Sequence, residues 1–457
     1  MRLAFYGDDF TGSTDALEVL AFAGLRCALF LAPPTPQALA ALGPLDAFGV
    51  AGDSRAMTPA EMDAALPAVF SALAASGAAI VHYKVCSTFD SAPGVGSIGR
   101  AMTLARSAFR RRWMPVVGAT PALRRYCAFG HLFARSATDD EVHRIDRHPI
   151  MSVHPVTPMS ESDLLRHLAA QGAPRMAGLS FTALEAGRAA LVAQLDARLA
   201  GGAEAVVLDG LNAAHMTRIG EVLAGEGSAA APLFVVGPSG VEYALTQWWR
   251  ECGQLAAEPP GVPPPARARR VLAISASASA LSAQQVDAAL AAGFEDVSVD
   301  AAALLDEHRR ASAADALFTR ALAALRAGRS VMLHTARGPG DERIAAAAAA
   351  MRALGMTDEE ARREAGRRLG RHLGDLTRAL LQAERVERLL VSGGDTSSAL
   401  VQALGPHALV LVARLAPGAP LCRALASQPW LDGIEIALKG GQMGGPQFFD
   451  EARRGRE

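Results

Sequence analysis

Short apolar runs alternate with longer amphipathic stretches along the chain. The apolar runs of the first half, each bounded by turn residues, lie at 3–6, 28–31, 47–50, 79–83, 115–117, 205–208 and 233–236. Runs of this length and kind predict buried strands. The stretches between them predict helices at 14–24, 59–75, 97–110, 161–170, 181–199 and 215–225. The alternation predicts an α/β fold with a mostly parallel sheet flanked by helices.

A proline-rich segment divides the chain into two parts. Prolines cluster within residues 256–269, where neither a helix nor a central strand can form, so we predict an extended linker there. A second series of strands is predicted after it, at 271–274, 297–299, 331–333, 388–391, 410–412 and 434–438. We therefore predict two α/β domains, 1–255 and 270–457, with the active site in the cleft between them, because domain interfaces favour ligand sites.

Composition limits the kinds of partner that fit the chain. Its 457 residues include 45 Lys and Arg against 46 Asp and Glu, for a net charge of −1. A balanced charge lacks the basic surface that nucleic acids and anionic membranes attract, so we expect a small-molecule partner. The five cysteines show no CxxC spacing, which argues against a zinc site or a disulfide framework. The opening residues lack the pattern of a signal peptide, and we expect a cytoplasmic protein.

The first strand ends in a crowded polar turn, Gly7-Asp8-Asp9-Phe10-Thr11-Gly12-Ser13. Ligands of open α/β sheets bind at the carboxyl ends of strands. Adjacent carboxylates such as Asp8 and Asp9 need cations or donors around them, since like charges raise one another's pKa. Capping of the next helix by Thr11 or Ser13 explains only part of the cluster. The whole cluster therefore predicts a functional site. Asp8 and Asp9 are its catalytic candidates, and Thr11 and Ser13 are its substrate-binding candidates.

Two more strand ends of the first domain carry similar residues. One reads Lys84-Val85-Cys86-Ser87-Thr88-Phe89-Asp90-Ser91. Lys84 offers a point charge for a substrate carboxylate, while Ser87 and Asp90 offer groups that bind hydroxyls. The other strand end brings Arg55, whose planar fork suits a carboxylate. Taken singly, Lys84 also fits a surface lysine and Arg55 an ordinary helix-entry turn.

Three strand ends of the second domain are rich in glycine and hydroxyl residues: Ser275-Ala276-Ser277-Ala278-Ser279, Ser392-Gly393-Gly394-Asp395-Thr396 and Lys439-Gly440-Gly441-Gln442-Met443-Gly444. Glycines let backbone amides approach a phosphate, and a following helix N-terminus favours negative charge. Asp395 suits either a nucleotide hydroxyl or a metal, and Thr396 also fits a plain N-cap. Neither a P-loop nor a Rossmann fingerprint occurs. Three such loops in one domain predict a phosphate or nucleotide site.

Together the two domains fit phosphoryl transfer. That reaction needs an acceptor hydroxyl near a carboxylate, and a phosphate held by amides and a metal. A phosphatase of the haloacid dehalogenase type begins instead with Asp-x-Asp, whereas Asp8 and Asp9 are adjacent. A non-catalytic sugar-acid-binding protein stays open as an alternative of a different class, although it leaves the glycine-rich loops without a purpose.

In their order along the chain, these motifs resemble those of the four-carbon acid sugar kinases. The family's opening D-D-[FL]-T-G is matched by Asp8–Gly12, and K-x-C-S-T-F-D-S by Lys84–Ser91. The K-x-C-S-T-F-D-S form of the second motif is similar to that of the 3-oxo-tetronate kinase branch of the family, as is the segment His154–Met159. Gly393–Thr396 and Lys439–Gly444 are similar to the family's nucleotide loops. The resemblance covers nearly the whole chain.

The resemblance implies an N-terminal sugar-acid-binding domain, a C-terminal nucleotide-binding domain and ATP-dependent phosphorylation of a terminal hydroxyl. The substrate it implies first is a 3-oxo-tetronate, which would give the 4-phosphate; 3-oxo-isoapionate, D-threonate and D-erythronate stay open. ATP contacts carried over with the nucleotide loops are Ser277, Ser279, Gly393, Gly394, Asp395, Thr396, Lys439, Gly441 and Gly444. The family usually has G-S-x-S at the first loop, and Ala276 in place of that glycine restricts the backbone there.

From these residues we expect a division of labour. Arg55 and Lys84 would hold the substrate carboxylate, and Asp8 or Asp9 would accept the proton of the attacking hydroxyl. The neighbouring hydroxyls would be bound by Ser87 and Asp90, and Mg²⁺ would bridge the ATP phosphates. Neither the metal ligands nor the oligomeric state, a homodimer included, follows from the sequence.

Overall fold

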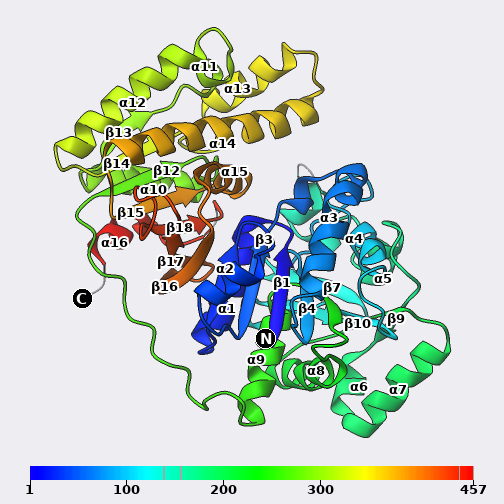
Figure 1. Ribbon diagram of the computed structural model, residues 1–457. Coiled ribbons are helices and arrows are strands. Elements are labelled where there is room, and N and C mark those ends of the chain that lie inside the picture. Colours follow the sequence, from blue (N-terminus) through cyan, green and yellow to red (C-terminus); the bar gives the residue numbers. More distant parts are fainter. Residues whose placement is uncertain (137–138, 155–156, 442, 456–457) are drawn as a thin grey trace. The chain divides into compact units, whose positions relative to one another are not determined.

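The computed structural model describes the chain apart from residues 137–138, 155–156, 442 and 456–457, and apart from the side chains of residues 359, 363 and 395. Contacts between Cα atoms divide the chain into two units (Figure 1). The first unit consists of Met1–Ala28 and Ala32–Pro260, and the second of Leu29–Leu31 and Gly261–Glu457.

The first unit is built around a sheet with the strand order β3-β1-β4-β11-β5-β10-β9, in which neighbouring strands are parallel. The strands are β1 Leu3–Gly7, β3 Ala47–Ala51, β4 Ile80–Lys84, β5 Met114–Val117, β9 Met176–Leu179, β10 Ala205–Leu208 and β11 Leu233–Gly237. Strand β2, Cys27–Phe30, has residues in both units. The central strands β1 and β4 are buried throughout, as expected of parallel strands that helices cover.

Helices connect these strands. They are α1 Phe10–Phe22, α2 Pro36–Ala41, α3 Pro59–Ala74, α4 Ile98–Ala105, α5 Leu164–Ala169, α6 Phe181–Glu185, α7 Arg188–Ala200, α8 Ala213–Glu226 and α9 Gly240–Glu251. The single helix expected over 181–199 is two helices in the structure, because Gly187 between them has a φ of +86°, which no helix accommodates.

The first unit also holds a small antiparallel sheet, β6 Arg125–Ala128, β7 His131–Arg135 and β8 Val142–Arg144. Its strands did not appear among the predicted ones, because their arginines and histidines interrupt the apolar pattern on which strand prediction depends. The turn between β6 and β7 is formed by Phe129 and Gly130, with φ values of +51° and +81°.

The second unit has the strand order β13-β14-β12-β15-β18-β17-β16. Its strands are β12 Val271–Ser275, β13 Glu295–Ser298, β14 Val331–His334, β15 Arg388–Ser392, β16 Ala408–Ala416, β17 Ala419–Leu425 and β18 Glu435–Lys439. In this order, neighbouring strands are parallel from β13 as far as β18. The last two strands, β17 and β16, pair in antiparallel orientation. The helices are α10 Ala280–Ala291, α11 Ala301–Leu305, α12 Arg310–Arg326, α13 Glu342–Arg352, α14 Asp358–Ala383, α15 Gly394–Leu404 and α16 Phe448–Arg454.

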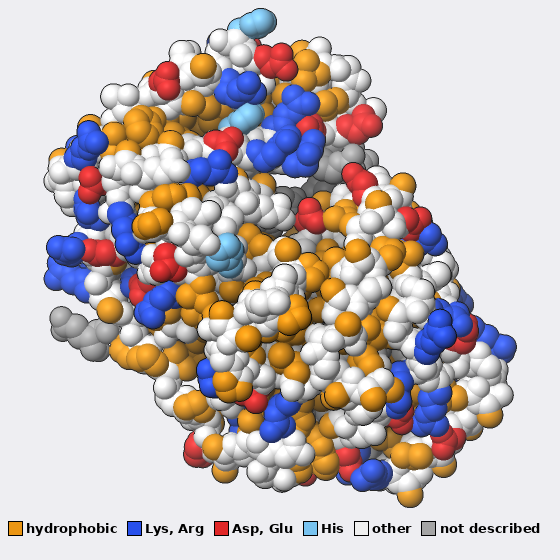
Figure 2. All heavy atoms as spheres, in the orientation of Figure 1, with side chains coloured by type: hydrophobic (Ala, Val, Ile, Leu, Met, Phe, Trp, Pro, Cys, Tyr) orange, Lys and Arg blue, Asp and Glu red, His pale blue; other side chains and the backbone are white. Residues whose placement is uncertain are grey.

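The predicted fold class is confirmed: both units are α/β, with mostly parallel sheets and helices between the strands. On the face drawn in Figure 2, basic and acidic side chains are interspersed rather than gathered by sign. Within the described part of the chain, every helix is too short or too polar to span a membrane.

Candidate active site

The polar strand ends of the first unit lie side by side. Gly7 at the end of β1 pairs with Ala51 of β3 and with Lys84 of β4. The amide of Asp8 donates to the carbonyl of Lys84 at 2.9 Å, and the amide of Arg55 donates to the carbonyl of Asp8 at 3.0 Å. The parallel register therefore places the acidic turn between the loops that follow β3 and β4.

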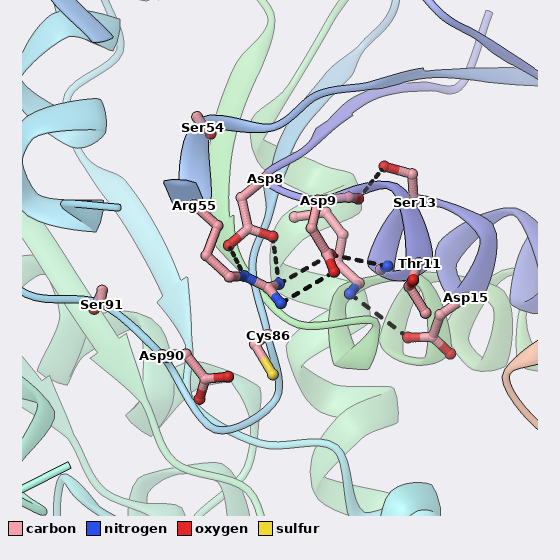
Figure 3. A network of polar contacts seen from close by, with 12 residues as sticks. Asp8, Asp9, Thr11, Ser13, Asp15, Ser54, Arg55, Cys86, Asp90 and Ser91 are labelled. Carbon is pink, nitrogen blue, oxygen red and sulfur yellow. Dashed lines mark hydrogen bonds and ion pairs between the residues drawn. The ribbon is translucent and has the colours of Figure 1, made fainter. Parts of the chain in front are cut away.

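A single arginine joins the two carboxylates of this turn (Figure 3). Arg55 donates from Nε and Nη2 to Asp8, at 3.1 and 2.7 Å, and from Nη1 and Nη2 to Asp9, at 3.0 and 2.9 Å. These bonds use four of the five N–H groups of the guanidinium. Arg55, expected from the sequence to bind a substrate carboxylate, thus has two protein carboxylates as its partners in the structure.

Burial and charge oppose each other in this group. Burial raises the pKa of Asp8, Arg55 lowers it and the Asp9 carboxylate raises it, with a net increase. Burial alone would lower the pKa of Arg55, but the two aspartates raise it well above its ordinary value. The side chain of Asp8 is 3% exposed and that of Asp9 is 19% exposed. Asp9 is therefore the more accessible of the two carboxylates.

Asp9 also begins helix α1. Its Oδ1 accepts a hydrogen bond from the amide of Gly12 at 2.9 Å, so Asp9 is the N-cap. The expectation that Thr11 or Ser13 caps this helix is wrong, because both lie inside the first turn, where their hydroxyls cannot accept from the N-terminal amides. Ser13 Oγ donates to the carbonyl of Asp9 at 2.7 Å. The buried Thr11 Oγ1 has no partner among the described residues.

Lys84 pairs with Asp15, a residue that the sequence did not single out. The Lys84 Nζ atom lies 3.6 Å from Asp15 Oδ2, and the lysine side chain is only 3% exposed. Burial lowers the pKa of Lys84, but Asp15 and the two aspartates of the turn raise it more, so the ammonium ion is retained. Asp15 lies three positions after Gly12 on α1 and therefore on the same face of the helix. This spacing is the sequence signal that could have identified Asp15 as part of the site.

Gly12 leaves the space that its polar neighbours need. A Cβ atom at this position would lie 2.8 Å from Lys84 Nζ and 2.4 Å from Asp9 Oδ1. No side chain fits there without displacing one of these groups. The glycine of the Asp-Asp-Phe-Thr-Gly turn is thus explained by the close approach of the ammonium group to the start of α1.

The loop after β4 carries a chain of polar contacts. Cys86 Sγ lies 3.0 Å from Thr88 Oγ1, which donates to the carboxylate of Asp90. Burial, and next the Asp90 carboxylate, raise the pKa of Cys86 to about 11, so it remains a thiol. The buried Phe89 has a φ of +55°, which is rare for an aromatic residue and fixes the shape of the loop. Half-buried Ser87 makes no side-chain hydrogen bond to a described residue.

In the second unit, the three glycine-rich loops also leave one edge of the sheet. Ser275 of β12, Ser392 of β15 and Lys439 of β18 are in register at the carboxyl ends of their strands. Two loops are tied directly, because Ser279 Oγ donates to the carbonyl of Gly441 at 2.6 Å. The structure thereby brings together residues that the sequence predicts as ATP contacts.

Two glycines of these loops are required by close packing. A Cβ atom at Gly441 would lie 2.1 Å from Ser277 Oγ. Gly393 has a φ of +130°, and a Cβ atom there would lie 3.0 Å from the carbonyl oxygen of Ala276. Gly444, in the third loop, also has a positive φ, of +78°. Ala276 therefore takes part through its backbone, which lies against the second loop.

The second loop continues into helix α15, whose first residue is the exposed Gly394. Thr396, in the first turn, is buried. Asp395 lies between them in the helix, and its side chain falls outside the described part of the structure.

Lys439 is a buried cation for which the described side chains provide no counter-charge. It is 0% exposed, and its Nζ donates to the carbonyl of Gly440 at 3.3 Å. The ammonium group lies 5.4 and 5.9 Å from the ring centres of Phe448 and Phe449. No carboxylate among the described side chains lies within ion-pair distance. Burial lowers the pKa of Lys439 to about 8, as expected for a cation that lacks an anion.

Nearby hydroxyls are also without partners. Ser275 Oγ, at the end of β12, and Ser397 Oγ, in the first turn of α15, are buried and make no hydrogen bond within the described structure. Unpaired hydroxyls at the same sheet edge as a cation without an ion pair suit an anion such as a phosphate. Over the described residues, no group of three His, Cys, Asp or Glu side chains is placed to hold a metal ion.

The two units correspond to two known domain families. Residues 3–245 match the model of a sugar-binding N-terminal domain, and residues 272–449 match that of a nucleotide-binding C-terminal domain. The chain belongs to the four-carbon acid sugar kinase family. A 3-oxo-isoapionate kinase of Paraburkholderia graminis is 42% identical over 459 residues, covering 100% of this chain and 95% of that protein. A 3-oxo-tetronate kinase of Cupriavidus necator is 31% identical, covering 99% and 96%.

Solved structures support the same fold. A Salmonella typhimurium protein described as a putative tRNA synthase superimposes with a TM-score of 0.75 at 26% identity, covering 99% of both chains. A Haemophilus influenzae protein superimposes with a TM-score of 0.70 at 22% identity, covering 98% of this chain and 99% of that one. The sugar-acid kinase family and the fold are thus established by independent comparisons.

Proposed function

We propose that the protein is an ATP-dependent kinase that phosphorylates the terminal hydroxyl of a small 3-oxo sugar acid. The observation that carries the proposal is the pairing of sites with domains. The carboxylate-rich strand ends lie in the part that matches a sugar-binding domain. Buried Lys439, and the hydroxyls of Ser275 and Ser397 that are unpaired within the described structure, lie in the part that matches a nucleotide-binding domain.

Two substrates have specific support. The 42% identity to a 3-oxo-isoapionate kinase, against 31% to a 3-oxo-tetronate kinase, favours 3-oxo-isoapionate. The Lys84–Ser91 motif favours a 3-oxo-tetronate, which would yield the 4-phosphate. Both are 3-oxo acids with a primary hydroxyl, so the same binding groups serve either. We place 3-oxo-isoapionate first and the 3-oxo-tetronate second, ahead of D-threonate and D-erythronate.

Asp9 is our candidate for the group that accepts the proton of the attacking hydroxyl. It is the more exposed carboxylate of the pair, and Arg55 together with the Gly12 amide fixes its orientation. Asp8 is buried against the same guanidinium, and we assign it the role of orienting Arg55. In phosphoryl transfer, position and charge contribute more than base strength, so a carboxylate held in this way is suited to the task.

The remaining polar groups of the first unit would bind the sugar acid. Lys84 contributes a retained positive charge, while Ser87 and Asp90 bind hydroxyls from the loop after β4. The buried hydroxyl of Thr11 at the start of α1 has no partner among the described residues and is available to the substrate. Ser13 is already bonded to the backbone of Asp9 and serves the turn itself.

In the second unit, the phosphates of ATP would meet Lys439 and the three glycine-rich loops. One side of this site would be formed by Ser277, Ser279 and Gly441. The other side would be formed by Gly393, Gly394 and Thr396. Asp395 lies between Gly394 and Thr396 in the sequence. When bound, ATP would supply the phosphoryl group, and Mg²⁺ would supply positive charge that neutralises the phosphates. An active site between the two domains and a cytoplasmic location stay predictions, and a homodimer stays open.

A coupled assay of ADP release tests the proposal. The wild-type protein is given ATP, Mg²⁺ and, in turn, 3-oxo-isoapionate, a 3-oxo-tetronate, D-threonate and D-erythronate. Turnover on a 3-oxo acid supports the proposal, and the ratio of kcat/KM values ranks the substrates. ADP release with none of the four would contradict it. A thermal shift caused by a sugar acid but not by ATP would favour the non-catalytic binding protein.

A further inference from the structure

Arg125, the first residue of β6, has a guanidinium group that the protein only partly uses. Its Nη1 donates to the carbonyls of Leu123 and Arg124, at 2.9 and 3.3 Å. Its Nε is buried and has no partner. Within the described structure, no carboxylate lies within ion-pair distance of this guanidinium. Two backbone carbonyls therefore orient a half-buried cation whose Nε and Nη2 edge has no acceptor among the described residues.

The surroundings of Arg125 belong to the candidate sugar site. Burial lowers the pKa of Arg125 below its ordinary value, and the thiol of Cys86 and the carboxylate of Asp90 oppose part of that decrease. Both of those residues lie on the loop after β4 that follows Lys84. Cys86 is in turn within electrostatic reach of Arg55. The backbone of Arg125 pairs with that of Thr120, which follows β5 at the carboxyl edge of the sheet. This pairing and the electrostatic contact with Asp90 place Arg125 at the sheet edge from which the loop after β4 also leaves.

The other cations around this loop already have anions. Arg55 is bonded to Asp8 and Asp9, and Lys84 is paired with Asp15. Of the arginines next to Arg125, both Arg124 and Arg135 pair with Asp140 on the exposed side of the small sheet. Arg125, by contrast, is half-buried and has no ion pair within the described structure, which is costly unless a ligand supplies an anion in direct contact.

We propose that Arg125 binds the carboxylate of the sugar acid through the free edge of its guanidinium. This assignment rests on the proposed function and names the residue that distinguishes an acid from a neutral sugar. It gives the substrate a direction: the carboxylate lies toward β6, the hydroxyls near Asp90 and Ser87, and the reacting end toward Asp9. A planar fork is the group best suited to a carboxylate.

The test compares Arg125→Gln with wild type on the sugar acid that wild type turns over best. Loss of a charge-assisted contact predicts a rise in KM for the acid of about tenfold or more, with KM for ATP unchanged. The acid's uncharged amide is assayed alongside it. Wild type should prefer the acid, and Arg125→Gln should lose that preference. Arg125→Lys, which keeps the charge but not the fork, should recover part of it.

Arg124→Gln is the matched control, because Arg124 is the exposed neighbour and pairs with Asp140. Its KM for the acid should stay within about twofold of wild type. An active wild-type enzyme with an unchanged KM in Arg125→Gln would overturn this assignment alone. An equal loss on acid and amide, with a raised KM for ATP, would overturn it as well, since it would indicate a structural role. A wild-type protein inactive on every sugar acid would overturn the proposed function and this assignment with it.

Discussion

At the scale of single residues, the acidic turn is a set of groups held at fixed distances by their neighbours. Asp9 has two roles that substitution can separate. It caps α1 through the Gly12 amide, and it presents the more exposed carboxylate of the site. Asparagine caps a helix as well as aspartate does but cannot accept a proton in the same way.

We therefore predict that Asp9→Asn keeps the stability of the protein to within about 1 kcal/mol while lowering kcat by about 100-fold or more. Asp9→Ala should in addition lose about 1 kcal/mol, because the cap is removed. Urea unfolding and steady-state kinetics measure the two effects. Near wild-type turnover in Asp9→Asn would show that this carboxylate is not the proton acceptor, and the same result in Asp8→Asn would remove the pair from that role.

Gly12 gives a second prediction at this scale. Its replacement by alanine puts a methyl group within 2.8 Å of Lys84 Nζ and 2.4 Å of Asp9 Oδ1, so the two groups must move apart. A shift of this size in a catalytic site costs about 100-fold in kcat/KM. Gly94→Ala, where a Cβ atom meets nothing within 4 Å, is the control and should stay near wild type. Equal activities of the two variants would contradict the assigned geometry.

Lys439 predicts how nucleotide binding depends on pH. With its pKa lowered to about 8 by burial, the side chain is charged below that pH and neutral above it. Phosphates bind the charged form better, so KM for ATP should be constant below about pH 8 and rise above it. Lys439→Met should have a high KM for ATP with no such step. A wild-type KM that stays flat from pH 7 to about pH 9.5 would show that Lys439 does not meet the phosphates.

At the scale of elements, α14 and α15 pack closely enough to set the position of the second nucleotide loop. A Cβ atom at Gly374 of α14 would lie 2.5 Å from the Cβ of Ala403 in α15. At Gly366 of the same helix, a Cβ atom would meet nothing within 4 Å. The two glycines thus differ in packing while sharing one helix.

We predict opposite effects of the same substitution at these positions. Gly366→Ala should stabilise the protein by up to about 1 kcal/mol, because alanine is the better helix former. Gly374→Ala should destabilise it by about 1–3 kcal/mol through overpacking, and should raise KM for ATP as α15 shifts. Denaturant unfolding of both variants measures the difference. Stabilisation by both substitutions would mean that α14 and α15 do not constrain each other.

Element prediction from sequence was accurate where an apolar run marks a buried strand. The run at 205–208 coincides with β10, and the runs at 47–50 and 271–274 match β3 and β12 to within one residue. It missed β6 to β8, whose polar residues carry no such pattern, and β17, which returns from β16 through Gly418 with a φ of +72°. These antiparallel strands owe their pairing to turns and neighbours rather than to a strand signal of their own.

At the scale of the whole molecule, the sequence identified the polar strand ends but not how they pair. Arg55 is 46 and 47 residues from the carboxylates it binds, so only the parallel register of β3, β1 and β4 makes them partners. Asp15 and Arg125 were missed for the same reason, because their importance comes from Lys84 and from the loop after β4. Motifs thus indicate where chemistry occurs, whereas the fold decides which charges remain free for a substrate.

The central claim is that this chain transfers a phosphoryl group from ATP to a 3-oxo sugar acid. Phosphorus NMR of the product formed with ATP, Mg²⁺ and 3-oxo-isoapionate tests it most directly, with Asp9→Asn run in parallel. A phosphomonoester signal on the terminal carbon of the acid, growing as ADP appears and nearly absent with Asp9→Asn, is the predicted result. ADP accompanied only by inorganic phosphate, or no reaction with 3-oxo-isoapionate or a 3-oxo-tetronate, would contradict the account.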